Sequence, residues 1–137
     1  MKPSDEFQAR YESFKKRPLV MHVHFPSRDS ASAFSRAALL AGLAAAANVR
    51  EVESMYVWNE DLCERQEWIV DLKTSAASFD ALACMASKGH RDQVPAIYTS
   101  DIGILTLAYQ DWILRHSLPA SDEIDPGDPS QTVTVAG

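Results

Sequence analysis

Two long alternating segments in the middle of the chain constrain its fold more than any other feature. Val52–Trp58 and Glu64–Lys73 follow the period-2 pattern of β-strands, and the polar residues Asn59, Glu60 and Asp61 join them. This arrangement predicts an extended β-hairpin. The arms carry large side chains that need burial: Tyr56, Trp58, Trp68, Val70 and Leu72. One small domain has little room to bury both faces of so long a hairpin, and so we expect a partner subunit to supply that burial.

Length and composition are those of one soluble domain. A chain of 137 residues suits a single hydrophobic core, and its 46% hydrophobic and 23% charged residues are ordinary for a globular protein. A net charge of -6 with one short basic run argues against nucleic-acid binding. The two cysteines form no CxxC pair, and no stretch approaches the roughly 20 apolar residues that span a bilayer. We therefore expect a cytoplasmic protein with neither a membrane nor a nucleic-acid partner.

The first half of the chain predicts a lead, a strand and a helix. Residues 1–17 form a polar lead with aromatic residues at helical spacing, which indicates a short helix. Leu19–Phe25 alternates, as a half-buried strand does, with an apolar face toward the core. Ser27 is placed to cap a helix whose alanine-rich interior is predicted to reach about Ala47.

The second half continues with a helix, a strand and a helix. Ser75 is placed to cap the first of these helices, and Gly89 suits the position just beyond its end. Val94–Tyr98 predicts an edge strand or a strand start, because a proline stands within it. The last helix is expected over residues 105–113.

The predicted order of elements defines a fold class. Strand, helix, hairpin, helix, strand and helix match a split βαβ layout, an α+β ferredoxin-like sandwich with two helices on one face of an antiparallel sheet. We expect residues 18–118 to form this domain. Residues 119–137 are acidic and rich in Pro, Ser and Gly, which predicts a mobile tail.

Several short segments resemble one family in order and spacing. They are Ser54–Glu60 in the hairpin, Ile69–Thr74 in its second arm, Phe79–Leu82 in the second helix, His90 with Val94, Pro95 and Ile97, and Tyr109 with Trp112. Together they resemble the CutA divalent-ion tolerance family over about residues 19–118. The resemblance implies a homotrimer in which long hairpins exchange contacts, and a role in tolerance of divalent cations such as copper.

The chain departs from the family pattern at two places that matter for a metal. Ala46 stands where the family has a cysteine, so the best ligand for a soft metal is missing. The family's His-Pro-Tyr-Glu-Val-Pro-Glu segment becomes His90-Arg91-Asp92-Gln93-Val94-Pro95-Ala96, which keeps the histidine and loses both glutamates. The resemblance makes His90 the transferred metal ligand, with copper or zinc as the ion.

Three other polar residues are candidate metal ligands. His22 and His24 stand two apart on a strand, so both project from the sheet face opposite the apolar one, a spacing that suits imidazole ligation. Their alternative role is that of hydrogen-bonded interface residues. Asp92 can join His90 as a hard ligand. For His90 the alternative is a local role at a helix end, where the dipole favours an imidazolium.

A second hypothesis is a cleft for a small anion. Lys73 and Arg65, with Tyr56 and Trp58, can line a cleft between subunits, as in the PII signalling proteins that CutA trimers resemble. Core or interface packing is the alternative for the aromatic residues. A third hypothesis is a scaffold whose lead and tail recruit a protein partner. No nucleophile motif or phosphate loop appears, and so we do not expect an enzyme.

Overall fold

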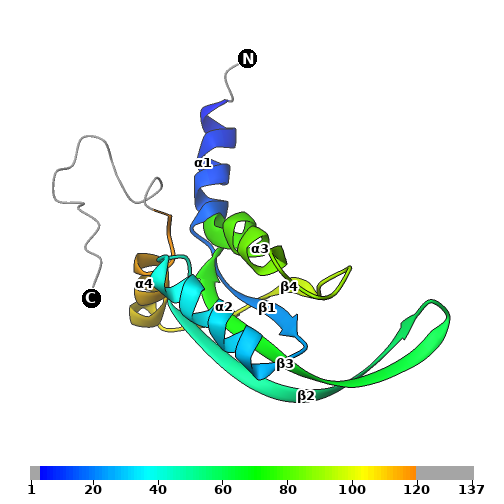
Figure 1. Ribbon diagram of the computed structural model, residues 1–137. Helices are drawn as coiled ribbons and strands as arrows, with labels where there is room; N and C mark the ends of the chain where they lie inside the picture. The colour runs from blue at the N-terminus through cyan, green and yellow to red at the C-terminus, as the bar shows by residue number, and fades with distance from the viewer. Residues whose placement is uncertain (1–3, 120–137) are drawn as a thin grey trace.

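The computed structural model describes residues 4–119 and places them in four helices and a four-stranded sheet (Figure 1). The elements are α1 (Asp5–Lys15), β1 (Pro18–Phe25), α2 (Arg28–Leu40), β2 (Ala46–Trp58), β3 (Asp61–Ser75), a 3-10 turn η1 (Ala76–Ser78), α3 (Phe79–Ser87), β4 (Ile97–Asp101) and α4 (Leu107–Arg115). The sheet order is β2-β3-β1-β4 and every neighbouring pair is antiparallel. This confirms the predicted α+β ferredoxin-like sandwich.

The core lies between one face of the sheet and helices α2 and α3. β1 alternates strictly, and its core-facing residues Leu19, Met21, Val23 and Phe25 are at most 8% exposed. Ala31, Phe34 and Ala38 of α2 and Leu82 and Ala86 of α3 complete the cluster with Val70 and Leu72 of β3. Small side chains on α2 let its backbone lie close to the sheet. None of the helices in this cluster covers the opposite sheet face, which carries His22 and His24.

Helix α2 is shorter than its alanine content predicts. It ends at Leu40, and Gly42 adopts a φ of 71°, in the left-handed region that glycine enters without steric cost. Gly42 and Leu43 donate their N–H groups to the carbonyls of Leu39 and Ala38, which closes the helix end. The predicted extension to Ala47 is wrong, because Ala46 and Ala47 already belong to β2.

The hairpin is longer than predicted and turns more tightly. Its arms have 13 and 15 residues and are joined by the two residues Asn59 and Glu60, whose φ angles are 50° and 68°. Two left-handed residues in a two-residue loop match the right-handed twist of the strands. Figure 1 shows the far end of the hairpin curling beyond the helices, so this part of both arms leaves the core.

Strand β4 begins three residues later than predicted. Ile97–Asp101 pairs with Leu19–Val23 of β1, whereas residues 94–96 belong to the loop before it. Pro95 has no N–H to donate to a strand ladder, and Ala96 contributes only its carbonyl, which accepts from the N–H of His24. The predicted strand Val94–Tyr98 is therefore displaced. The loop of residues 88–96 faces the hairpin.

The segment that joins α1 to β1 and the segment after α4 both contact the region of η1. The Arg17 carbonyl accepts from the N–H of Ala76, and the Ser117 carbonyl accepts from the hydroxyls of Ser75 and Ser78. Helix α1 buries no side chain, and Phe7, Tyr11 and Phe14 stay 46–58% exposed. The tail predicted for residues 119–137 lies, from residue 120 onward, outside the described residues. The domain limits at residues 18 and 118 stay a prediction.

Candidate functional site

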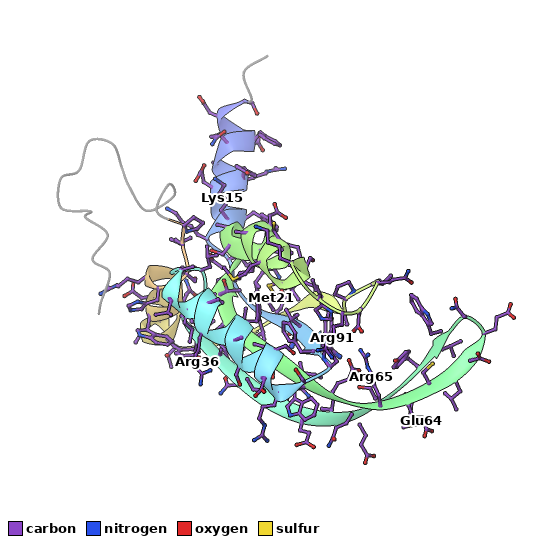
Figure 2. The ribbon with its side chains drawn as sticks, in the orientation of Figure 1. Lys15, Met21, Arg36, Glu64, Arg65 and Arg91 are labelled. Atoms are coloured by element: carbon purple, nitrogen blue, oxygen red, sulfur yellow. The ribbon has the colours of Figure 1, made fainter. Side chains whose placement is uncertain are left out.

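A groove of about 470 Å³ opens between the curled hairpin and the 88–96 loop. We call it the hairpin groove; its lining residues are His24, Ser54, Met55, Tyr56, Trp58, Arg65, Glu67, Arg91, Asp92, Gln93, Val94 and Ala96. Figure 2 shows Arg65 on the inner side of the hairpin near Arg91, while Glu64, its neighbour in sequence, points to the outer side. The alternation of β3 thus selects which side chains face the groove.

Arg65 is the centre of the groove's charged floor. Its Nη1 and Nη2 atoms donate to the two carboxylate oxygens of Asp92, at 3.0 and 2.6 Å. Nη2 also donates to Glu67 Oε2 at 3.1 Å, and the guanidinium lies 5.5 Å from the Tyr56 ring centre. The buried Nε of Arg65 has no hydrogen-bond partner among the described residues. One guanidinium therefore joins a loop carboxylate to a strand carboxylate.

These contacts keep all three groups charged. Hydrogen bonds from Arg65 lower the pKa of Asp92, although burial opposes the shift. Burial by itself raises the pKa of Glu67, but hydrogen bonds from Ser54 and Arg65 outweigh it and lower that pKa. The Asp92 hydrogen bonds in turn raise the pKa of Arg65 above its ordinary value.

A second charged cluster lies next to the groove on the same sheet face. His22 Nδ1 donates to Asp71 Oδ1 at 2.7 Å, and His22 Nε2 hydrogen-bonds the Ser100 hydroxyl at 2.7 Å. Arg50 Nε donates to the other Asp71 oxygen at 2.8 Å. Burial raises the pKa of Asp71, but the bonds from Arg50 and His22 outweigh it and lower that pKa. The His22 ring stacks on Tyr98, with 4.8 Å between ring centres.

His24 connects the two clusters. Its Nε2 hydrogen-bonds the Tyr98 hydroxyl at 2.8 Å, and its Nδ1 lies 3.7 Å from Glu67 Oε1. Its side chain is 16% exposed, so one edge of the ring remains open to the groove. Of the three predicted histidine ligands, His24 alone has a ring nitrogen, Nδ1, for which no hydrogen bond is found among the described residues.

His90 is fully buried and uses both ring nitrogens. Nε2 lies 2.7 Å from the His24 carbonyl oxygen, which only accepts, so this nitrogen carries the proton. Nδ1 accepts the N–H of Asp92 at 3.1 Å, and the ring stacks on Phe25. The imidazole is therefore the neutral Nε2–H tautomer. Its contacts hold the start of the 88–96 loop against β1.

The groove gathers only part of the predicted site. Tyr56, Trp58 and Arg65 line it together with His24 and Asp92. Lys73 does not, because it is eight residues from Arg65 on β3, or ~27 Å along an extended strand, and its Nζ donates to Asn48 Oδ1. His22 belongs to the neighbouring cluster. Among residues 4–119, no three His, Cys, Asp or Glu side chains are arranged to hold a metal ion within one copy.

Sequence reasoning missed Glu67 and Asp71. Both lie on β3 on the same side as Arg65, opposite Trp68, Val70 and Leu72. An acidic residue at 5% exposure inside a strand is costly unless it is paired. The period-2 geometry of β3 was the signal that could have placed these carboxylates on one face with Arg65.

Comparison with known proteins identifies the family. A family model described as "CutA1 divalent ion tolerance protein" matches residues 19–116. The chain belongs to the CutA1 family. This confirms the resemblance found in the sequence. The family's description names tolerance of a divalent ion and no reaction, and no described helix of this chain is long and apolar enough to cross a membrane.

The alignments with individual CutA relatives span nearly the whole length of each relative. The divalent-cation tolerance protein CutA of Thermococcus kodakarensis is 30% identical over 97 residues, which are 71% of this chain and 93% of the relative. The CutA1 structure from Thermus thermophilus has a TM-score of 0.70 at 27% identity and covers 73% of this chain and 98% of its own. That from a psychrotrophic Shewanella species also has a TM-score of 0.70, at 26% identity, covering 76% and 98%. Helix α1 precedes the matched region.

Proposed function

We propose that this chain acts in divalent-cation tolerance, as a homotrimer that binds copper or a similar divalent ion without catalysing a reaction. The observation that supports the proposal most is the family match over residues 19–116. The matched region contains the sheet from Leu19 onward, the hairpin groove and the charged clusters around Arg65 and Asp71. The proposed function is therefore assigned to this domain.

Exposed apolar side chains on the hairpin support the homotrimer. Met55, Val57 and Leu62 are 68–71% exposed near its tip, and Val94 of the facing loop is 71% exposed. A patch of this kind marks a surface that a partner covers. A second copy is the simplest partner, because the hairpin also projects beyond the core of its own subunit. The trimer would place copies of the same patch in contact.

The metal proposal places ions between copies rather than inside one. Copper and zinc take about four ligands, and the described residues of one copy do not converge on an ion. His22 and His24 lie on the open sheet face, where side chains from another copy can complete a site. His90 and Asp92 stay candidates in a different sense, since a metal there would replace a hydrogen bond that each now makes.

Native mass spectrometry with added copper or zinc tests this proposal. A trimer that takes up metal in multiples of three supports it. Uptake that falls in a His22→Gln, His24→Gln double variant, with a His90→Gln variant unaffected, assigns the ions to the sheet face. The opposite pattern assigns them to His90. A metal-free trimer contradicts the cation-binding role, and a monomer contradicts the assembly.

The hairpin groove favours a second candidate function, the binding of a small anionic ligand, as in PII-like sensors. The observation that supports this candidate is that Arg65 and Arg91 line the same cavity as the exposed Tyr56 and Trp58. Aromatic walls beside two arginines suit an anion that also carries an apolar or aromatic part. This function predicts ligand-dependent stabilisation of the metal-free protein.

The cytoplasmic location also stays part of the proposal. Its support is the pair of free cysteines, Cys63 and Cys84, which form no disulfide. Fractionation of the source cells tests it, and recovery of the protein outside the cytoplasm contradicts it.

A further inference from the structure

We propose that Asp92 occupies the anion position of the hairpin groove, and that a carboxylate or phosphate on an aromatic ligand binds Arg65 by replacing it. The inference rests on the second proposed function, the groove as a ligand site. It adds the chemical class of the ligand and a consequence for the 88–96 loop. That loop is released when the ligand takes the place of Asp92.

The geometry of the Asp92–Arg65 pair is that of an anionic ligand bound to an arginine. Two parallel N–H···O bonds of 3.0 and 2.6 Å form the bidentate arrangement that a guanidinium makes with free carboxylates and phosphates. Asp92 itself lines the groove, so its carboxylate lies where a ligand enters. The Tyr56 ring beside the guanidinium and the exposed Trp58 offer stacking surface to a ring attached to the incoming anion.

Charge balance allows the exchange. Arg65 is joined to two carboxylates, and Glu67 is the fixed one, because it lies on β3 at 5% exposure. The pair of Arg65 and Glu67 is neutral. Exchange of Asp92 for a singly charged anion such as a carboxylate therefore leaves the charge of the site unchanged, a phosphate adds further negative charge beside Arg65 and Arg91, and binding beside a retained Asp92 adds repulsion. Arg91 at the groove lining can attract the arriving anion.

The loop is held in a way that lets its middle move. His90 holds its start through the His24 carbonyl, and Ala96 holds its end through the His24 N–H. Between these two points, the hydrogen bonds found in the described part of the chain all run through Asp92. Breaking the Asp92 carboxylate contacts therefore frees residues 91–94 without disturbing either anchor.

The experiment uses the full-length protein in metal-free buffer, with phenyl phosphate and benzoate as probes. Calorimetry measures affinity, and hydrogen exchange measures protection of the amide of residue 92, whose N–H is hydrogen-bonded to His90 Nδ1. We expect binding to reduce that protection in the wild type. Asp92→Asn retains the size of the side chain but not its charge. In this variant we expect low protection before any ligand is added, and an affinity for the probes about fivefold higher than that of the wild type. The stronger of the two probes distinguishes phosphate from carboxylate, and inorganic phosphate should bind less than phenyl phosphate.

Two further variants separate the possible outcomes. Arg65→Lys keeps the positive charge but loses the two parallel N–H donors of the guanidinium, and we expect this variant not to bind the probes. Arg50→Gln removes an arginine from the same sheet face but from outside the groove, and should bind like the wild type. Equal affinity in wild type and Asp92→Asn, with loop protection unchanged, overturns the exchange and leaves the groove function standing. If no probe binds either protein, both proposals fail.

Discussion

At the scale of single residues, the sheet face opposite the helices is a set of charges that satisfy one another. Arg50 and His22 meet on Asp71, while Asp92 and Glu67 meet on Arg65. Each carboxylate is partly buried and needs its cationic partner to remain ionised. Removing one member therefore leaves another uncompensated, and single substitutions here should cost more than ordinary surface changes.

His90→Ala should destabilise the protein by about 2–4 kcal/mol even without metal. The substitution removes a buried ring and leaves the His24 carbonyl and the Asp92 N–H without their partner. Urea unfolding with added chelator, at fixed protein concentration, measures this cost. His116→Ala is the control, because that histidine is at the exposed end of α4. Equal stability of the two variants would show that His90 does not hold the loop.

Asp71→Asn should destabilise the protein at pH 7 and have a smaller effect at pH 3. Because Arg50 and His22 lower the pKa of Asp71 in the folded state, they stabilise that state above the ordinary carboxyl pKa of 3.8. This stabilisation is lost as the pH falls through the lowered pKa. We expect a difference of about 1–2 kcal/mol at pH 7. Urea unfolding at pH 7, 5 and 3 measures it, with Asp111→Asn as an exposed ion-pair control that stays within roughly 0.5 kcal/mol.

At the scale of elements, turns and helix ends decide where each segment stops. The hairpin changes direction within Asn59 and Glu60, and Gly42 follows the end of α2, all three in left-handed backbone. Helix α1 is a contrast, since it is capped by Ser4 yet buries nothing. An 11-residue helix with no packed face is marginal in water, so α1 should be the least protected helix.

Glu60→Gly should stabilise the hairpin by about 1 kcal/mol. Glutamate at a φ of 68° bears a steric cost that glycine avoids. Glu53→Gly, the same substitution in the extended backbone of β2, should instead destabilise by a similar amount. Thermal unfolding of both variants at one concentration measures the difference. A loss of stability in both would mean that the turn carries no strain.

Much of the fold follows from local patterns, whereas the site depends on distant contacts. The alternation of β1 predicts both its buried face and the shared side of His22 and His24. The end of α2 could not be predicted from alanine content, because Gly42 stops a run of good helix formers. The pairing of Arg65 with Asp92 joins residues 27 positions apart across a loop, and no local pattern specifies it. The side of β3 on which Glu67 lies follows from alternation, but its burial and its partners do not.

At the scale of the whole molecule, the domain has one covered sheet face, one charged face and a hairpin that leaves the core. Its apolar tip is the part least explained by a single copy. The charged face holds the cluster around Asp71 and the cluster around Arg65, and it opens into the hairpin groove. Assembly, cation uptake and ligand binding would therefore share one side of the molecule.

Val57→Glu should weaken assembly while the subunit stays folded. Val57 is 71% exposed and faces Leu62 across the strands, so glutamate costs little in a free copy but places a charge in an apolar contact between copies. Sedimentation velocity should show smaller species at micromolar concentration, with an unchanged circular dichroism spectrum. Leu40→Glu, at the end of α2 where the leucine is 83% exposed, should sediment like the wild type. Identical sedimentation of the two variants would remove the hairpin tip from the interface.

The position of β2 has a consequence for a newly synthesised copy. As the outer strand of the sheet, it presents 13 residues of backbone with pairing on one side only. Such an edge recruits other extended chains and can begin fibrous aggregation. Arg50, Glu51 and Glu53 place charges along it, which discourage stacking of identical strands. Neutralising Glu51 and Glu53, which lie outside the Asp71 cluster, should make overexpressed protein accumulate in inclusion bodies, although neither touches the core.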